Sequence, residues 1–140
     1  MSEKVQVVIF KELNEKIEVL LLQTNQNRGQ FWQNVTGGKE ANDNSNFDAA
    51  KREVKEEIGI ELDQNDLFDL DKSFNYYDAN RNIHYLEHLF MARVYTDAIT
   101  LSPEHQAYRW VSSNAIQANS YKFKSSFQAF LSALDFFHQE

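Results

Sequence analysis

"GGKEANDNSNFDAAKREVKEEIGI", residues 37–60, predicts a loop followed by an amphipathic helix. On a helical wheel at about 100° per residue, four apolar side chains fall within about 80° of one another: Phe47, Ala50, Val54 and Ile58. This face is expected to pack against the core of the protein. The helix is predicted to run from about Asn46 to Ile58, with Gly59 as its natural end.

The same helix carries three glutamates on one flank. Glu53, Glu56 and Glu57 lie beside the apolar edge, with Glu53 three and four residues from its partners. Like charges at these spacings cost roughly 0.2–0.5 kcal/mol per pair, and acids in the last turn oppose the helix dipole. The other charged side chains lie on the opposite flank and are expected to be solvated: Asp48, Lys51 and Lys55.

The acidic flank therefore needs a positive partner. Arg52 is the one cation beside it and can neutralise about one carboxylate. Mg²⁺ or Mn²⁺ would balance the rest, since both prefer oxygen ligands, and the absence of cysteine leaves carboxylates and histidines as ligands. The alternative is an ordinary solvated face of a Glu- and Lys-rich helix. Three of the four glycines, Gly37, Gly38 and Gly59, flank this helix, which favours close approach of a ligand.

The rest of the chain predicts a mixed sheet flanked by helices. The pattern indicates a hairpin over residues 5–23, a loop with a short extended piece over 25–38, a second hairpin over 67–96, a strand over 108–113, and a last helix over 122–139. Ser113 or Asn114 is expected to cap a brief helix after the strand. The aromatic stripe of the last helix is interpreted as core packing. The fold class is therefore α/β (α+β), an α/β/α sandwich around a central mixed sheet.

Composition limits the class of protein. The chain has 140 residues, of which 42% are hydrophobic, and residues 1–140 are expected to form a single domain. No long uncharged apolar run or signal-peptide pattern is present, so we expect a cytoplasmic protein that does not bind membranes. A net charge of −7 argues against binding duplex nucleic acid, whereas a small phosphorylated ligand held through a divalent cation remains compatible. A monomer and a homodimer both fit.

The helix and its flanking glycines resemble the Nudix box, G-x5-E-x7-R-E-U-x-E-E-x-G-U, where U is a bulky apolar residue. Gly38 matches the first position, and the last block is matched without a gap by Arg52, Glu53, Val54, Glu56, Glu57, Gly59 and Ile60. One position departs from the pattern, because Asn44 stands where the family has its first glutamate. Glu40 and Asp43 are the candidates to replace that acid. The box covers residues 38–60, and the predicted element order resembles the family fold over nearly the whole chain.

The resemblance implies an enzyme that hydrolyses a nucleoside diphosphate linked to another group, using a divalent metal and a water molecule. Glu53, Glu56 and Glu57 are then the expected metal ligands, with the carbonyl oxygen of Gly37 as a further ligand. Glu53 or Glu57 would accept the proton of the attacking water. Arg52 would orient Glu53. The expected cofactor is Mg²⁺ or Mn²⁺.

Two further stretches, "FWQNVTGG" (residues 31–38) and "PEHQAYRWV" (residues 103–111), resemble the bacterial dihydroneopterin triphosphate pyrophosphohydrolases of this family. That subgroup also cleaves deoxynucleoside triphosphates, giving a monophosphate and pyrophosphate. By this resemblance Glu104 joins the metal site, although it is also interpretable as a turn residue. Residues assigned to substrate binding by the same resemblance are Thr36, Lys39, Trp32 and Lys122, with Lys124 as an alternative to Lys122 and solvated lysines as the plainer interpretation.

Substrate identity stays open at this point. Aromatic candidates to stack on a base or pterin, which are equally typical of a core, are Trp32, Phe74, Tyr76, Tyr77 and Tyr85. We interpret the histidines as packing or surface residues: His84, His88 and His105. The alternatives to a triphosphate pyrophosphohydrolase are a hydrolase of nucleoside diphosphate sugars or dinucleoside polyphosphates, and a nucleotide-sensing module without catalysis, which Asn44 motivates.

Overall fold

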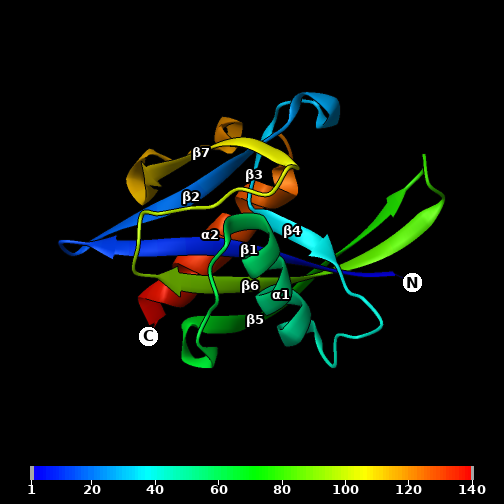
Figure 1. Cartoon of the computed structure of the whole chain (residues 1–140), viewed down its shortest axis with the longest axis horizontal. Helices are drawn as coiled ribbons and strands as arrows, with labels where there is room; N and C mark the ends of the chain where they lie inside the picture. Colours follow the sequence, from blue (N-terminus) through cyan, green and yellow to red (C-terminus); the bar gives the residue numbers. More distant parts are fainter. Residues whose placement is uncertain (1, 140) are drawn as a thin grey trace.

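The protein is an α/β/α sandwich, shown by a computed structural model that describes residues 2–139 (Figure 1). Its helices are α1 (Asn46–Ile58) and α2 (Lys124–Gln139), and its strands are β1 (Ser2–Leu13), β2 (Lys16–Thr24), β3 (Trp32–Gln33), β4 (Val35–Gly38), β5 (Leu67–Asp78), β6 (Ile83–Val94) and β7 (His105–Ser112). Short 3₁₀ turns are η1 (Gln26–Arg28), η2 (Gln64–Asp66), η3 (Ser113–Ala115) and η4 (Ala118–Ser120). Within residues 2–139, no helix is long and apolar enough to span a membrane.

The strands form one seven-stranded mixed sheet, which confirms the predicted fold class. The central order is β3-β2-β1-β6-β5, with β4 paired to β1 and β7 paired to β2. β1 and β6 run parallel, whereas the other pairs are antiparallel. The β1–β2 and β5–β6 hairpins agree with the two predicted from the sequence.

Two hydrophobic cores lie on opposite faces of the sheet, one under each helix (Figure 1). Alternation along β1 explains the division, because Val7 and Ile9 point to the α1 side while Val8 and Phe10 point to the α2 side. On α1 the predicted apolar face is the one that packs on this sheet, with Val54 and Ile58 fully buried. The sandwich thus holds the acidic flank of α1 rigidly against the sheet.

Local signals determine where α1 begins and ends. The Ser45 side chain caps the first turn by accepting a hydrogen bond from the backbone N–H of Asp48. Gly59 ends the helix in the left-handed conformation with φ of 74°, as predicted. A Cβ there would lie 2.9 Å from the side chain of Thr100, so both conformation and space require glycine.

Several details differ from the sequence prediction. β7 begins at His105 rather than at residue 108, and α2 begins at Lys124 rather than at residue 122. The brief helix after β7 is only the 3₁₀ turn η3, which Ser112 precedes without a side-chain cap. The prediction that Ser113 or Asn114 caps it was therefore wrong. Pairing of β7 with β2 extends the strand, a tertiary effect that local sequence does not encode.

Candidate active site

Glu53 lies against the backbone of β4. A Cβ built on Gly37 would fall 1.5 Å from Oε2 of Glu53, so only glycine permits this approach. The Glu53 carboxylate therefore lies directly against the Gly37 backbone. Burial raises the pKa of Glu53 to about 7, and the nearby acids Glu56 and Glu104 contribute in the same direction. The charge of Arg52 lowers this pKa, but by less.

Glu57 is the most deeply buried acid of the cluster, with 2% of its surface exposed. Neither of its oxygens has a hydrogen-bond partner of normal geometry among the described residues. Burial raises its pKa well above the ordinary value, and the charges of Glu53 and Glu104 raise it further, outweighing the backbone amide of Thr36. Burial therefore disfavours the charged form of Glu57, and a bound cation would favour it.

Arg52 lies beside the acidic flank of α1, and its hydrogen bonds go to Asp43, Glu56 and Gly38 rather than to Glu53. Nε donates to Asp43 at 3.0 Å, Nη1 donates to both oxygens of Glu56 at 3.1 and 2.9 Å, and Nη2 donates to the Gly38 carbonyl oxygen at 2.8 Å. Glu53 lies only within a 3.6 Å ion contact of Nη1. Arg52 therefore holds the loop and Glu56 more directly than it holds Glu53.

Asp43 is the acid of the loop before α1 that pairs with Arg52. Its side chain is 6% exposed and accepts hydrogen bonds from Nε and Nη2 of Arg52. This pairing holds the pKa of Asp43 below its ordinary value. Asn44 is exposed. Of the two acids considered as replacements, Asp43 makes these hydrogen bonds, whereas Glu40 reaches Arg52 only at 3.6 Å.

The carboxylates of α1 are of the type that a hard divalent cation prefers, although their side chains do not converge on one point. Within the described chain, no group of three or more His, Cys, Asp or Glu side chains is arranged to hold a metal ion. Glu56 instead turns toward Arg52. The two bare oxygens of Glu57 and the neighbouring Glu53 carboxylate nevertheless fit Mg²⁺ or Mn²⁺, because both ions take oxygen ligands and keep positions for water and phosphate.

Glu104 faces the same region from the loop before β7. It is exposed and pairs with Arg28, whose Nη1 lies 3.1 Å from Oε2. The loop is fixed to the η1 turn, because the Asn25 side chain donates to the Pro103 carbonyl oxygen and the Asn25 backbone N–H donates to that of Glu104. Glu104 lines the same cavity as Glu53 and Gly37.

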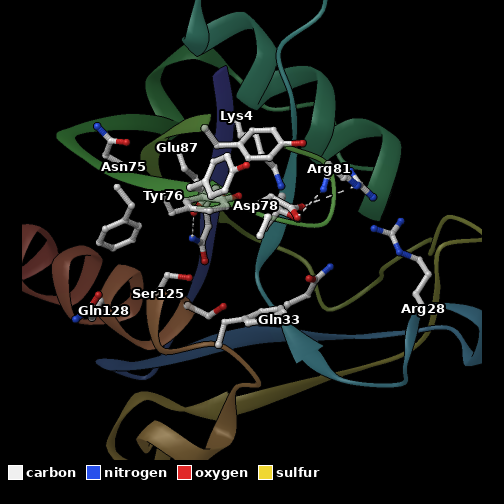
Figure 2. Close-up of a pocket in the computed structure, with 18 residues that line it drawn as sticks. Lys4, Arg28, Gln33, Asn75, Tyr76, Asp78, Arg81, Glu87, Ser125 and Gln128 are labelled. Carbon is white, nitrogen blue, oxygen red and sulfur yellow. Dashed lines mark hydrogen bonds and ion pairs between the residues drawn. The ribbon is translucent and has the colours of Figure 1, made fainter. Parts of the chain in front are cut away.

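Two cavities share part of their lining, and Figure 2 shows the larger of the two. The smaller, of about 360 Å³, is lined by Glu53, Glu104 and the two glycines of β4. The larger, of about 690 Å³, lies between the β5–β6 hairpin and the start of α2. Residues that line both cavities, and so mark their junction, are Lys4, Arg28, Thr36, Arg81 and Tyr85. Three of these five are cations, which suits a ligand whose phosphates lie at the junction.

The structure brings only some of the predicted substrate residues to these cavities. Thr36 lines both, and Lys39 lines the smaller one, where it also pairs with Glu3 at 3.4 Å. Trp32 and Lys122 line neither. The Trp32 ring lies under the Arg109 guanidinium, 4.3 Å away, and packs on the α2-side core. Of the predicted aromatic candidates, the ones that do line the larger cavity are Phe74, Tyr76, Tyr77 and Tyr85.

His105 is a site neighbour that sequence reasoning missed. It is buried, its Nε2 lies 3.7 Å from Oε1 of Glu57, and the same nitrogen lies 3.2 Å from the Gln33 side-chain nitrogen. Burial lowers its pKa and favours the neutral ring. The interpretation as a packing residue was therefore incomplete. Its position at the start of β7, far in sequence from the helix, left no local signal.

Comparison with known proteins decides the family, because residues 3–131 match the NUDIX domain model. The chain belongs to the Nudix family. It is 35% identical over 122 residues to a dihydroneopterin triphosphate diphosphatase of Haemophilus influenzae, an alignment covering 79% of this chain and 74% of that protein. It is 33% identical over 105 residues to an asymmetrical bis(5'-nucleosyl)-tetraphosphatase of Mus musculus, covering 74% and 70% of the two chains.

A solved structure agrees with this assignment. The dihydroneopterin triphosphate pyrophosphohydrolase of E. coli superposes with a TM-score of 0.79 at 28% identity, over 95% of each chain. The protein is therefore a Nudix hydrolase, a pyrophosphohydrolase that acts on small nucleotide-like phosphorylated substrates. Enzymes of this family generally use divalent metals. The roles of individual residues stay predictions.

Proposed function

We propose that this Nudix hydrolase is an Mg²⁺- or Mn²⁺-dependent enzyme that cleaves a triphosphate, either dihydroneopterin triphosphate or a (deoxy)nucleoside triphosphate, into a monophosphate and pyrophosphate. The observation that carries the proposal is the buried carboxylate of Glu57, which has no hydrogen-bond partner of normal geometry among the described residues and lies close to Glu53. Glu53 in turn lines the smaller cavity, which shares three cations with the larger one. The named activities of the Haemophilus influenzae and E. coli relatives support the choice of substrate.

The acidic residues have distinct parts in this mechanism. Glu53, Glu57 and the Gly37 carbonyl would hold the metal. Glu104 lines the same cavity as Glu53 and Gly37, and Glu56 would be available if it leaves Arg52. A bound divalent ion supplies charge neutralisation on the phosphates and eases deprotonation of water. Glu53 or Glu57 would accept the proton of the attacking water. In the metal-free protein, burial raises the pKa of Glu53 to about 7.

The reaction breaks one phosphoric anhydride bond. Oxygen from water forms a new bond to phosphorus, the bridging oxygen leaves with the pyrophosphate, and the water proton passes to the carboxylate base. Lys4, Arg28 and Arg81 at the junction would hold the phosphate oxygens, with Lys39 within the smaller cavity. The aromatic walls of the larger cavity would hold the heterocycle.

A substrate panel tests the proposal. The protein is incubated with Mg²⁺ and dihydroneopterin triphosphate, the four dNTPs, an ADP-sugar and diadenosine tetraphosphate, and products are identified by chromatography. Pyrophosphate and a monophosphate from the triphosphates are expected. Preferred cleavage of the tetraphosphate would favour the second candidate, a dinucleoside polyphosphate hydrolase, which the Mus musculus relative supports. Preferred cleavage of the sugar nucleotide would overturn the triphosphate assignment.

We further infer that residues 1–140 act as one domain. The family match spans residues 3–131, and both hydrophobic cores lie on the same sheet. A single cooperative unfolding transition is the expected behaviour. Sedimentation of the enzyme with and without substrate would distinguish the monomer from the homodimer.

A further inference from the structure

A second buried carboxylate lies in the larger cavity, on the opposite face of the sheet from α1. Glu87 of β6 is 4% exposed and lines the cavity wall. Its neighbours across the sheet are Lys4 on β1 and Phe74 on β5. It has no part in the metal chemistry proposed above. Burial raises its pKa, while Lys4 and the Gln6 amide partly offset that effect.

A chain of hydrogen bonds fixes how this carboxylate is presented. The Asn34 amide nitrogen donates to the backbone carbonyl of Ser126 at 3.2 Å and to Oε1 of Gln6 at 2.8 Å. Gln6 therefore has its amide nitrogen free to donate to Glu87, at 3.0 Å. Because a backbone carbonyl can only accept, the polarity of the whole chain is set at Ser126. Glu87 is its terminal acceptor.

The residues of this chain are themselves buried. Gln6 and Asn34 are each 1% exposed, so neither amide can flip without losing hydrogen bonds that water cannot replace. A carboxylate has about four acceptor positions, and Gln6 uses one of them. Glu87 can accept further hydrogen bonds from a molecule in the cavity while keeping its contact with Gln6.

Aromatic rings stand beside the carboxylate. Tyr76 and Tyr85 are cross-strand partners whose ring centroids are 5.3 Å apart, and Phe74 is the cross-strand partner of Glu87. Strand alternation places all four side chains on one face of the β5–β6 hairpin. Figure 2 shows Tyr76 and Glu87 together on one side of the cavity, with Arg28 and Arg81 toward the other. A flat ring beside Glu87 would thus have its phosphates directed to the cationic junction.

We propose that Glu87 recognises the heterocycle of the substrate, and that it selects rings with two adjacent N–H donors, the 2-amino-4-oxopyrimidine edge shared by guanine and pterins. The ring N–H and the 2-amino group of that edge would each donate to one carboxylate oxygen. This assignment rests on the proposed triphosphate hydrolase and specifies its substrate class.

Other bases present the wrong pattern to a carboxylate. Adenine and cytosine pair their amino group with a ring nitrogen lone pair, which would face a carboxylate oxygen of Glu87. Uracil and thymine offer one N–H between two carbonyl oxygens. A site that is built to accept hydrogen bonds penalises a ligand that leaves its buried acceptors unpaired. Guanine and pterins therefore share an advantage that the phosphate contacts cannot provide.

The experiment compares binding of monophosphates, which the hydrolase leaves intact. Dissociation constants of GMP, IMP and AMP are measured by calorimetry for the wild type and for Glu87→Gln. The wild type is expected to bind GMP about tenfold or more tightly than AMP, with IMP weakened because it lacks the 2-amino group. Glu87→Gln should weaken GMP binding about 30-fold or more and change AMP binding less than about threefold, because its amide offers a donor where the ring needs an acceptor.

Equal weakening of GMP and AMP by Glu87→Gln, or equal binding of GMP, IMP and AMP by the wild type, would overturn the assignment. Glu61→Gln is the matched control, since it also removes one glutamate charge but from an exposed side chain that contacts Lys55 only at 4.0 Å. It should leave all three dissociation constants unchanged. If Glu87→Gln does not fold, the ratio of GMP to IMP binding by the wild type decides the question alone.

Hydrolysis assays run beside the binding experiment separate the two proposals. Selective GMP binding with no triphosphate cleavage would refute the proposed function and leave the role of Glu87 standing. Triphosphate cleavage without preference for GMP over AMP would refute the role of Glu87 and leave the proposed function standing. A dGTP preference over dATP that Glu87→Gln abolishes supports both.

Discussion

Glu57 and Glu87 are both nearly inaccessible to solvent, and burial raises the pKa of each, yet their surroundings differ. Glu57 has no hydrogen-bond partner of normal geometry among the described residues and lies near two further acids. Glu87 ends an ordered chain of amides and has Lys4 beside it. The first arrangement is unstable without a cation, and the second is already organised for hydrogen-bond donors. Burial alone therefore does not tell what a carboxylate binds.

The largest effect is expected from Glu57→Gln. Losing this ligand should lower kcat by about three powers of ten or more, since the metal's charge neutralisation would be lost. The metal-free fold should be as stable or more stable, because a neutral amide replaces a buried carboxyl group that lies near the charges of Glu53 and Glu104. Steady-state kinetics with saturating Mg²⁺ and urea unfolding in EDTA measure the two effects. Activity within tenfold of the wild type would show that Glu57 is not a metal ligand.

Gly37→Ala tests the close contact between β4 and Glu53. The new Cβ would lie where the Glu53 carboxylate now lies, so that side chain must move away. We expect kcat/KM to fall about 10- to 100-fold, with a higher Mg²⁺ requirement, because misplacing a catalytic group by about 1 Å costs roughly this much. Gly38→Ala is the matched comparison, since no atom lies within 4 Å of its Cβ position, and it should lose less than about threefold. Equal losses would show that Glu53 need not contact Gly37.

The sequence predicted the acidic neighbours of Glu57 but not the surroundings of Glu87. The spacing of Glu53, Glu56 and Glu57 along one helix placed all three on one flank, because helix geometry is local. Glu87 was only one residue of an alternating strand. Its partner Gln6 is 81 residues away, so the contact depends on the parallel pairing of β1 with β6.

The positions of three other residues also depend on contacts between distant parts of the chain. Trp32 was expected at the substrate, yet the strand direction turns it toward Arg109 and the α2-side core. Lys122 lies before α2 begins and lines neither cavity. His105 reaches Glu57 through the β2–β7 pairing. Residue type and hydrophobic periodicity predicted the helices and strands. Side-chain neighbours across the sheet could be identified only once the register of the strand pairs was known.

The stability of the metal-free enzyme should fall as pH rises. The pKa of Glu53 is about 7 in the folded state, above the ordinary value of 4.5, so between these values the folded state holds a proton that the unfolded state has released. The free energy of unfolding should therefore decrease by about 1–2 kcal/mol between pH 5 and 8, after allowing for partial solvation. Glu53→Gln should flatten this slope, and Mg²⁺ should restore stability at pH 8. An unchanged slope in the variant would place the titration elsewhere.

The smallest effect is expected from Asn44→Glu, which restores the family's acid. Arg52 has five N–H donors, and these are already directed to Asp43, Glu56 and the Gly38 carbonyl. A glutamate at the exposed position 44 would find no free donor on Arg52, so kcat/KM should stay within about threefold.

Asp43→Asn should cost more than Asn44→Glu, because it removes a nearly buried charge that Arg52 grips through two nitrogens. We expect about 1–3 kcal/mol of lost stability and a several-fold lower kcat/KM. The double variant Asp43→Asn, Asn44→Glu then measures whether the two positions are interchangeable. Full recovery would show that any acid in this loop suffices. If the double variant recovers neither stability nor kcat/KM, the loop depends on Asp43 itself. A tenfold gain in kcat/KM from Asn44→Glu alone would contradict the pairing of Arg52 with Asp43.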